Sequence, residues 1–293
     1  MMKKLDEKVV AVILTQNRKD LLQKGLKGLF SQTTPIYKIL IVDSVSTDGT
    51  FQALSDKGIL KRSNVKYIRL KENKGPSGGF AEGIKCAIKE NPSWVWILDD
   101  DIFPEKKCLE NLLKFKKISQ CIAPYRDKTV PFFNPAIGLS SHNSSLSFNT
   151  GKDYVFTNTC CFEGMLINAK IIKKIGLPDE RFFQVYGDTI YGFVASIHTN
   201  IVHVKNAVMV RLLTNKKPLT SKRVYLLIRN HFLVREYLKK FNLYRPSFFI
   251  SIFMLMILYY SIIMAIKNLS IRMSFSVFKG IFDGLTGKFG VPK

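Results

Sequence analysis

Apolar and polar positions in the first hundred residues alternate between short hydrophobic runs and helical spacing. Val9–Leu14 and Ile39–Val42 are brief β-branched runs, and Asn17–Phe30 between them carries leucines at helical intervals. The alternation continues with a third run, a second helical stretch and a fourth run, at Val65–Leu70, about 79–90 and Trp94–Leu98. This order predicts an α/β fold in which a mostly parallel sheet is flanked by helices.

The pattern loosens after the fourth run. Residues 109–117 are spaced as an amphipathic helix, and the stretch from Pro124 to Asn149 is rich in Pro, Asn and Ser, which predicts loops and short strands. Residues 155–175 return to apolar packing, and Gly176-Leu177-Pro178 then ends a helix. We therefore predict one α/β domain over residues 1–213.

The C-terminal part differs in charge and hydropathy. The whole chain carries a net charge of +23, and residues 201–293 hold 16 Lys and Arg against 2 Asp and Glu. Residues 246–266 are uncharged over a length that can span a bilayer. Basic residues beside an apolar segment are typical of attraction to acidic lipids, so an anionic membrane surface is a better partner than nucleic acid. Residues 214–293 are predicted to be a helical, membrane-associated region.

A second apolar helix follows that segment, with large side chains recurring at helical spacing at Ile271, Phe275, Phe278, Phe282 and Leu285. Such a helix is typical of one that lies in the membrane interface. A buried hairpin that packs on the enzyme is the alternative. The early run Val9–Leu14 is too short for a signal-peptide core, and the five cysteines form no CxxC pair. We expect a protein on the cytoplasmic face of the membrane.

Polar clusters fall where three of the predicted strands end, at Thr15–Arg18, Asp43–Gly49 and Asp99–Asp101. Ligands of such sheets bind beyond the carboxyl ends of the strands. Three consecutive aspartates repel one another unless a cation is present, and Mg²⁺ or Mn²⁺ would take carboxylate and phosphate oxygens there. The alternative is that Asp101 only caps a helix after Ile102-Phe103-Pro104.

Two further segments are weaker on their own. In Asp43–Thr50 a carboxylate can bind a base or ribose, but Ser46 and Asp48 can equally cap the next helix. Asn73–Phe80 opens a helix with a Gly-rich turn whose amides can approach phosphate. It has neither the Walker spacing nor GxGxxG, so it supports neither an NTPase nor a dinucleotide enzyme.

Taken together and in this order, these motifs resemble the family 2 glycosyltransferases with the GT-A fold. The resemblance continues through Glu163–Ile167 and Gly176–Phe183 to Gly187–Gly192, and it includes Tyr225–Asn230 and Gly280–Gly290. It implies that a nucleotide-sugar donor contacts Thr15, Asn17, Arg18, Asp43, Asn73, Gly78, Gly79, Phe80, Asp99 and Asp100. It also implies that Asp99 and Asp101 hold the Mn²⁺ or Mg²⁺ ion.

Asp188 is the candidate general base in this resemblance, since inverting transfer needs one carboxylate to take a proton from the acceptor hydroxyl. The family usually has paired acids and a further acid at this segment, but here Gly187 and Ile190 replace two of them. An N-cap role for Asp188 is the alternative, and Glu163 is the other acid that could act as the base. Some relatives supply a histidine metal ligand where this chain has Arg211.

The sequence therefore predicts a bacterial, metal-dependent, inverting glycosyltransferase. The donor is a nucleotide diphosphate sugar, with UDP favoured, and the acceptor is a lipid-linked cell-surface glycan. The motifs resemble galactofuranosyltransferases most, with rhamnosyltransferases second. The missing acids motivate a non-catalytic, membrane-anchored sugar-nucleotide binder as the alternative. A sugar nucleotidyltransferase would need a Gly-rich loop after the first strand, and residues 15–20 contain no glycine.

Overall fold

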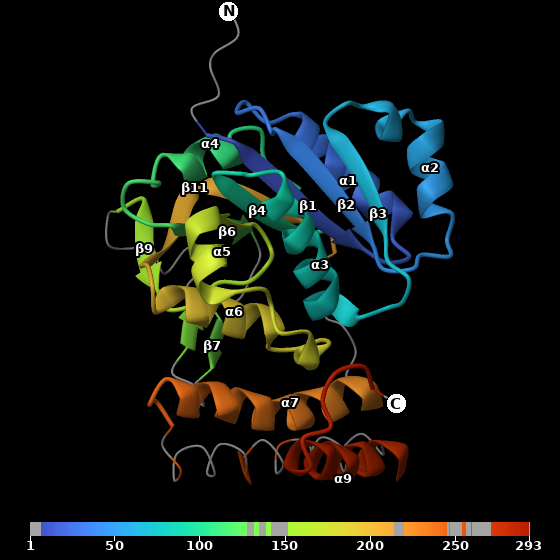
Figure 1. Ribbon diagram of the computed structural model, residues 1–293, viewed down its shortest axis with the longest axis vertical. Coiled ribbons are helices and arrows are strands. Elements are labelled where there is room, and N and C mark those ends of the chain that lie inside the picture. Colours follow the sequence, from blue (N-terminus) through green and yellow to red (C-terminus); the bar gives the residue numbers. More distant parts are fainter. Residues whose placement is uncertain are drawn as a thin grey trace, which may run out of the picture.

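The computed structural model describes residues 7–127, 132–134, 139–141, 152–213, 220–244 and 271–292, together with Pro246, Met254, Leu255 and Tyr259. Figure 1 shows a sheet with helices on both faces, and beneath it two helices that run side by side along one end of the molecule. The N-terminal strands lie at the opposite end from these two helices.

The main sheet has nine strands among the described residues. Its first half is parallel, in the order β3-β2-β1-β4. These are the four apolar runs of the sequence. β1, β2 and β4 are buried along almost their whole length, as parallel strands covered by helices should be, whereas every residue of β3, at the edge of the sheet, is partly or fully exposed. Their bounds are β1 Val9–Thr15, β2 Lys38–Asp43, β3 Val65–Arg69 and β4 Trp94–Asp99.

The second half of the sheet is mixed. β10 lies antiparallel between β4 and β6, and β11 pairs with β6 in parallel and with β5 and β9 in antiparallel fashion. A separate two-stranded sheet pairs β7 with β8. The bounds are β5 Ile102–Pro104, β6 Cys121–Asp127, β7 Phe132–Asn134, β8 Leu139–Ser141, β9 Tyr154–Thr157, β10 Met165–Asn168 and β11 Ile201–Arg211.

Helices cover both faces of the sheet. Alternate residues of β1 point to opposite faces, so Val9, Ala11 and Ile13 pack with α1 and α4 while the intervening residues pack with α3, α5 and α6. The helices are α1 Lys19–Phe30, α2 Thr50–Asp56, α3 Gly75–Lys89, α4 Cys108–Leu113, α5 Ala169–Ile175 and α6 Gly187–Ser196, with short 3₁₀ turns η1 Ile59–Lys61 and η3 Glu180–Phe182. The predicted α/β sheet with helices on both faces is thus confirmed.

The two helices at the end of the molecule are α7, Ser221–Lys240, and α9, Ile271–Leu285. Val224 and Ile228 of α7 pack against Met273 and Val277 of α9. The helices approach closely, since a Cβ at Gly284 would lie 2.2 Å from the ring of Phe232. α7 thus lies between α9 and the α/β layer (Figure 1).

No helix among the residues that the structure describes is long and apolar enough to cross a membrane. The predicted apolar run 246–266 and the boundary between 213 and 214 fall on or beside residues outside the described ranges. So does most of the Pro, Asn and Ser-rich stretch 124–149. The proposed division at residue 214 therefore stays a prediction.

Candidate functional site

The register of the parallel strands brings three predicted clusters to one edge of the sheet. Thr15 at the end of β1 lies beside Asp43 at the end of β2, and Leu14 lies beside Asp99 at the end of β4. Because the carboxyl ends of parallel strands share an edge, the loops after them converge. The predicted site therefore exists as one region, next to the N-terminus of α3.

Loops after β1 and β2 are bonded to each other through Asn17, which has a positive φ of 52°. Its backbone N–H donates to the Ser46 hydroxyl at 2.9 Å, and its side-chain oxygen accepts the Thr47 N–H at 2.6 Å. Asp48 accepts the N–H groups of Lys19 and Thr50, both at 3.1 Å. Asp48 thus accepts hydrogen bonds from the first turns of two helices, in line with the capping alternative. The Ser46 hydroxyl instead accepts the Asn17 N–H.

Asp43 is completely buried and accepts three donors. These are the Ser46 N–H at 2.7 Å, one guanidinium nitrogen of Arg69 at 3.1 Å and the hydroxyl of Tyr67. Burial and the Asp43 carboxylate raise the pKa of Tyr67, so its hydroxyl stays a donor. Sequence reasoning missed Arg69 and Tyr67. Arg69 lies at the end of β3, and ligands of such sheets bind beyond the carboxyl ends of the strands, so its position could have identified it. A role for Asp43 in holding the base stays a prediction.

The Gly-rich turn before α3 is closely packed. Asn73 accepts the Gly75 N–H at 2.8 Å and the Ser44 hydroxyl at 3.2 Å, which joins this turn to the end of β2. A Cβ at Gly79 would lie 2.6 Å from the Leu14 side chain. Phe80 is 1% exposed, and its ring packs against that of Phe162 in the core at an angle of 58°. Gly79 and Phe80 thus set the packing of α3 on β1, and contact of Gly78, Gly79 and Phe80 with a donor stays a prediction.

Two side chains of the aspartate triplet, Asp100 and Asp101, contact Arg18. Asp100 is buried and accepts the Thr15 hydroxyl at 2.7 Å and a guanidinium nitrogen of Arg18 at 2.9 Å. The same Arg18 nitrogen lies 3.3 Å from Asp101. The helix that follows residues 102–104 is α4, whose N-cap is Lys107, and strand β5 separates it from Asp101, so the helix-capping alternative for Asp101 is wrong. The triplet sits on a turn between two strands, with one cation already beside it.

The antiparallel strands add residues from distant parts of the chain. Met165 of β10 pairs with Ile97 of β4, so Glu163 just before β10 lies near the end of β4. Arg211 at the end of β11 pairs with Ile102, directly after the triplet, and forms an ion pair with Glu163. Arg211 is thus next to the acidic site, where the family resemblance expects a metal-binding histidine in some relatives.

Five carboxylates influence one another at this place. Burial, followed by the charge of Glu163, raises the pKa of Asp99 well above its usual range; smaller contributions come from Asp101, Asp100 and Asp188. Burial also raises the pKa of Asp188, and the charge of Glu163 adds to this rise. We call Asp99, Asp101, Glu163 and Asp188 the acidic cluster. Such mutual repulsion is relieved by a cation, which fits a divalent metal that a phosphate helps to bind.

Ligands for such a metal would come from the aspartate triplet. No group of three or more His, Cys, Asp or Glu side chains within the described part of the chain is arranged to hold an ion. Mg²⁺ commonly takes one or two carboxylates together with substrate phosphates, so a pair from the triplet suffices chemically. Asp100 is bonded to Thr15 and Arg18, and Arg18 also lies 3.3 Å from Asp101, so metal binding by Asp99 and Asp101 stays a prediction.

Asp188 lies in the first turn of α6, whose N-cap residue is Tyr186. The N-cap alternative for Asp188 is therefore wrong in position, although its carboxylate accepts the Thr189 N–H at 2.7 Å. A Cβ at Gly187 would lie 2.1 Å from the Ser77 hydroxyl oxygen. Ile190 is buried against Phe182 and residues of α7. Packing thus explains why this chain has no acid at 187 or 190.

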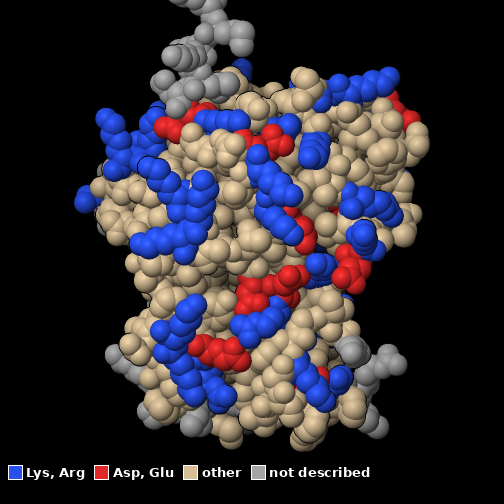
Figure 2. Space-filling view, in the orientation of Figure 1, with Lys and Arg blue, Asp and Glu red and all other residues tan. Residues whose placement is uncertain are grey.

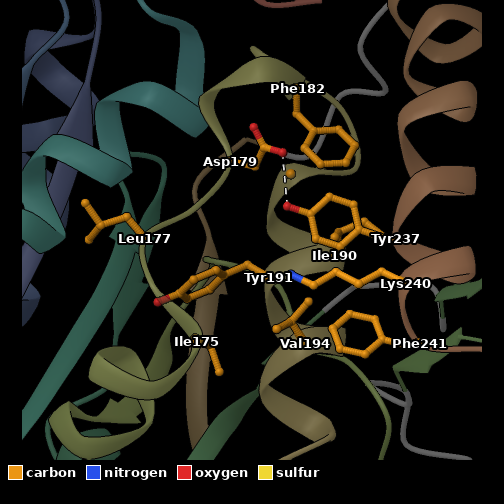
Figure 3. A pocket seen from close by; sticks show the side chains of 11 residues that line it. Ile175, Leu177, Asp179, Phe182, Ile190, Tyr191, Val194, Tyr237, Lys240 and Phe241 are labelled. Atoms are coloured by element: carbon orange, nitrogen blue, oxygen red, sulfur yellow. Dashed lines mark hydrogen bonds between the residues drawn. The ribbon is translucent and has the colours of Figure 1, made fainter.

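A pocket of about 70 Å³ lies outside the acidic cluster. Figure 3 shows that its side chains come from the 175–182 segment, α6 and the C-terminal half of α7. The Tyr237 hydroxyl donates to Asp179 at 3.0 Å across it, and the Tyr191 hydroxyl donates to the Gly176 carbonyl at 3.0 Å. Only Gly187 of its lining borders the predicted base, so this pocket is not the predicted site.

The chain is similar in sequence to known glycosyltransferases. The family model described as Glycosyl transferase family 2 matches residues 10–176. Galactofuranosyltransferase GlfT1 of Mycobacterium tuberculosis is 29% identical over 196 residues, which cover 64% of this chain and 63% of that protein. The match thus spans just under two thirds of the relative's own length.

Solved structures share the fold. Mannosyltransferase PcManGT from Pyrobaculum calidifontis, in complex with GDP-Man and Mn²⁺, superposes with a TM-score of 0.58 at 16% identity and covers 98% of this chain and 78% of that chain. S. aureus TarS 1-349 in complex with UDP-GlcNAc gives a TM-score of 0.55 at 16% identity, covering 77% and 66%. At such identities the likeness concerns the fold alone, and the predicted GT-A architecture is confirmed.

Proposed function

Because the chain belongs to glycosyl transferase family 2, we propose that it transfers a sugar from a nucleotide diphosphate donor to an acceptor hydroxyl. The observation that carries this proposal is the acidic cluster at the carboxyl edge of the sheet, where the pKa values of Asp99 and Asp188 are raised together. Such a pair of acids beside a predicted diphosphate site suits group transfer better than binding alone.

Asp188 is the proposed general base. Its carboxylate takes the proton of the acceptor hydroxyl while that oxygen attacks the anomeric carbon and the bond to the diphosphate breaks. Attack from the face opposite the leaving group inverts the configuration at that carbon. A carboxyl group whose pKa lies above its ordinary value is a stronger base than an exposed aspartate, which favours this role.

Asp99 and Asp101 would hold a divalent ion, Mn²⁺ or Mg²⁺, which when bound would neutralise charge on the donor's diphosphate. Arg18 lies beside Asp100 and Asp101 and adds a fixed positive charge at the same place. The complex of PcManGT with Mn²⁺ supports a metal in proteins of this fold. Thr15, Asn17 and Asp43 would position the nucleotide, since they line the ends of β1 and β2.

Galactofuranose is the favoured sugar and rhamnose the second. The support is the 29% identity to galactofuranosyltransferase GlfT1 over 196 residues. A lipid-linked cell-surface glycan is the favoured acceptor, because the C-terminal helices of this chain suit a membrane surface. The binder without catalytic activity is the alternative, but Gly187 and Ile190 are explained by packing and so do not argue for a lost base.

The membrane part of the proposal depends on α9. Its outer face exposes Phe275, Phe278, Phe282 and Leu285, which are 59% to 71% exposed. Lys288 lies 5.1 Å from the ring of Phe282, so positive charge flanks the apolar face. In Figure 2 the edge formed by the C-terminal helices is largely uncharged, with Lys and Arg side chains just above it. Apolar side chains beside basic ones favour the interface of an acidic leaflet, here the cytoplasmic one.

One experiment tests the activity and the sugar together. The purified chain is incubated in detergent with Mn²⁺, a lipid-linked glycan and, separately, UDP-galactofuranose, dTDP-rhamnose and UDP-glucose. Elongated lipid-linked product should form with one donor and should be lost with Asp188→Asn. Donor binding without product from any of these donors would favour the non-catalytic alternative.

A further inference from the structure

The segment directly before Asp188 has an unusual backbone. Phe183, Val185 and Tyr186 have positive φ values of 57°, 69° and 68°. Left-handed backbone is costly for residues with a Cβ and most costly for a β-branched one such as Val185, so it persists only when surrounding contacts enforce it. We call residues 183–186 the left-handed loop. Its end is the N-cap of α6, so its shape decides where Asp188 lies.

One side chain of α7 holds this loop. The Asn230 amide nitrogen donates to the carbonyl oxygens of Phe182, Gln184 and Val185, at 2.8, 2.7 and 3.1 Å. Asn230 is completely buried, so a single amide group out of contact with water holds all three carbonyls. A buried polar group that fits several backbone acceptors fixes a conformation more than it adds net stability.

Arg229 holds Asn230 in turn. Two of its nitrogens donate to the Asn230 side-chain oxygen, at 3.0 and 2.9 Å, which fixes the amide with its nitrogen towards the loop. A third nitrogen donates to the carbonyl of Gly290 at 2.8 Å, and the Gly290 N–H donates to the Arg181 carbonyl at 2.7 Å. The C-terminal segment therefore closes the same network.

The opposite side of the loop meets the donor half of the site. The Ser77 N–H at the start of α3 donates to the Phe183 carbonyl at 3.0 Å. A Cβ at Gly75 would lie 2.3 Å from the same carbonyl oxygen, and Gly75 itself has a φ of +67°. The loop is thus confined between the Gly-rich turn and α7, and a shift of α7 would move it.

We propose that Asn230, oriented by Arg229, is a positioning residue for Asp188. It keeps the left-handed loop in the conformation that places Asp188 with the other three acids of the acidic cluster, so the C-terminal helices complete the catalytic site as well as facing the membrane. This inference rests on the proposed function and on Asp188 as its base. Misplacement of a reacting group by about 1 Å can cost roughly 100-fold in rate, so the effect should be measurable.

Asn230→Asp is the sharpest test, because it keeps the oxygen that Arg229 binds and the volume of the side chain. It removes both N–H donors and opposes three carbonyl oxygens with a carboxylate. In full-length protein we expect kcat to fall about 10- to 100-fold while the donor Kd, measured by calorimetry with UDP and Mn²⁺, changes less than about twofold. Asn230→Ala is the second variant, for use if Asn230→Asp folds poorly, and it should lower kcat by a similar factor.

Tyr237→Phe is the matched control. It lies on the same helix and loses a hydrogen bond to Asp179 of the same segment, but it touches no carbonyl of the left-handed loop. Its kcat should stay within about twofold of wild type. Equal kcat in Asn230→Asp and wild type would overturn the positioning role alone. Equal losses of kcat, donor affinity and Tm in both Asn230 variants would also overturn it, in favour of a role in folding. Absence of transfer by wild type would remove the proposed function and this inference together.

Discussion

Arg211, at the end of β11, forms an ion pair with Glu163, the carboxylate whose charge contributes most after burial to the raised pKa of Asp99. The two residues are 48 positions apart in the chain. They meet because β11 pairs with β5 and β10 pairs with β4, on either side of the aspartate triplet. Arg211 therefore moderates the repulsion within the acidic cluster.

Replacing Arg211 by methionine should raise the pKa of Asp188. Without the guanidinium, the unshielded Glu163 charge disfavours ionisation of Asp188, and a base works only when ionised. The acid limb of the kcat profile should therefore move to higher pH, with Arg211→Lys close to wild type. If the profiles of kcat against pH coincide for Arg211→Met and wild type, Arg211 does not influence the pKa of Asp188.

Removing the metal should stop the reaction. If Asp99 and Asp101 bind a divalent ion that offsets the diphosphate charge, excess EDTA should abolish transfer and weaken UDP binding, and added Mn²⁺ should restore both. Asp101→Asn should need more Mn²⁺ for half-maximal rate than wild type does. Undiminished transfer in EDTA would contradict the metal assignment and leave Arg18 and Arg211 as the cations of the site.

Asp188→Asn should lower kcat by roughly 10²–10⁴-fold with donor affinity nearly unchanged, since general-base assistance is typically of that size. The substitution keeps an oxygen that can accept the Thr189 N–H, so Tm should stay close to wild type. Glu163→Gln is the comparison. If that variant loses as much rate while Asp188→Asn does not, Glu163 is the base.

Phe278→Glu should release the protein from acidic vesicles. The substitution removes the favourable free energy of moving one aromatic side chain of α9 from water into the membrane interface. We expect the partitioning of the protein onto vesicles to fall about tenfold or more. Flotation with vesicles that contain phosphatidylglycerol measures this. Phe156→Glu is the control, because Phe156 is similarly exposed but lies on β9. Equal flotation of both variants would argue against α9 as the docking helix.

Stability should fall as the pH drops from 7 to 5. Burial, and then the charge of Arg235, lowers the pKa of His231 from its ordinary value of 6.5 to about 4. The unfolded chain takes up this proton below pH 6.5 and the folded protein does so only near pH 4, so unfolding is favoured in between. The loss should be about 2 kcal/mol between pH 7 and 5.

Urea unfolding of wild type and His231→Gln at these two pH values checks this prediction. The difference between the two proteins in their pH dependence isolates the contribution of His231 from that of the acidic cluster. His198→Gln, at an exposed position, is the matched control and should keep the wild-type dependence. The same pH dependence in His231→Gln and wild type would contradict burial of a neutral ring.

Local sequence patterns predicted the parallel half of the fold and the places where its strands end. The apolar runs that became β1, β2, β3 and β4 are short and β-branched, and their length and the helical spacing between them leave few other arrangements. The Asp99–Asp101 triplet was recognisable because its members are adjacent in the chain. These features depend on near neighbours, which is why sequence alone determined them.

Tertiary structure decided which distant residues meet this edge. Glu163, Arg211 and Arg69 reach it only because of the order and direction of the strands, and nothing in their local sequence specifies that order. The hydrogen bonds from Asn230 to the left-handed loop likewise require α7 to pack against α6. They join residues that are 45 or more positions apart in the chain. Sequence determined the strand-end chemistry because it is local. Packing decided the backbone directly before Asp188, because side chains from separate elements hold a conformation that its own residues disfavour.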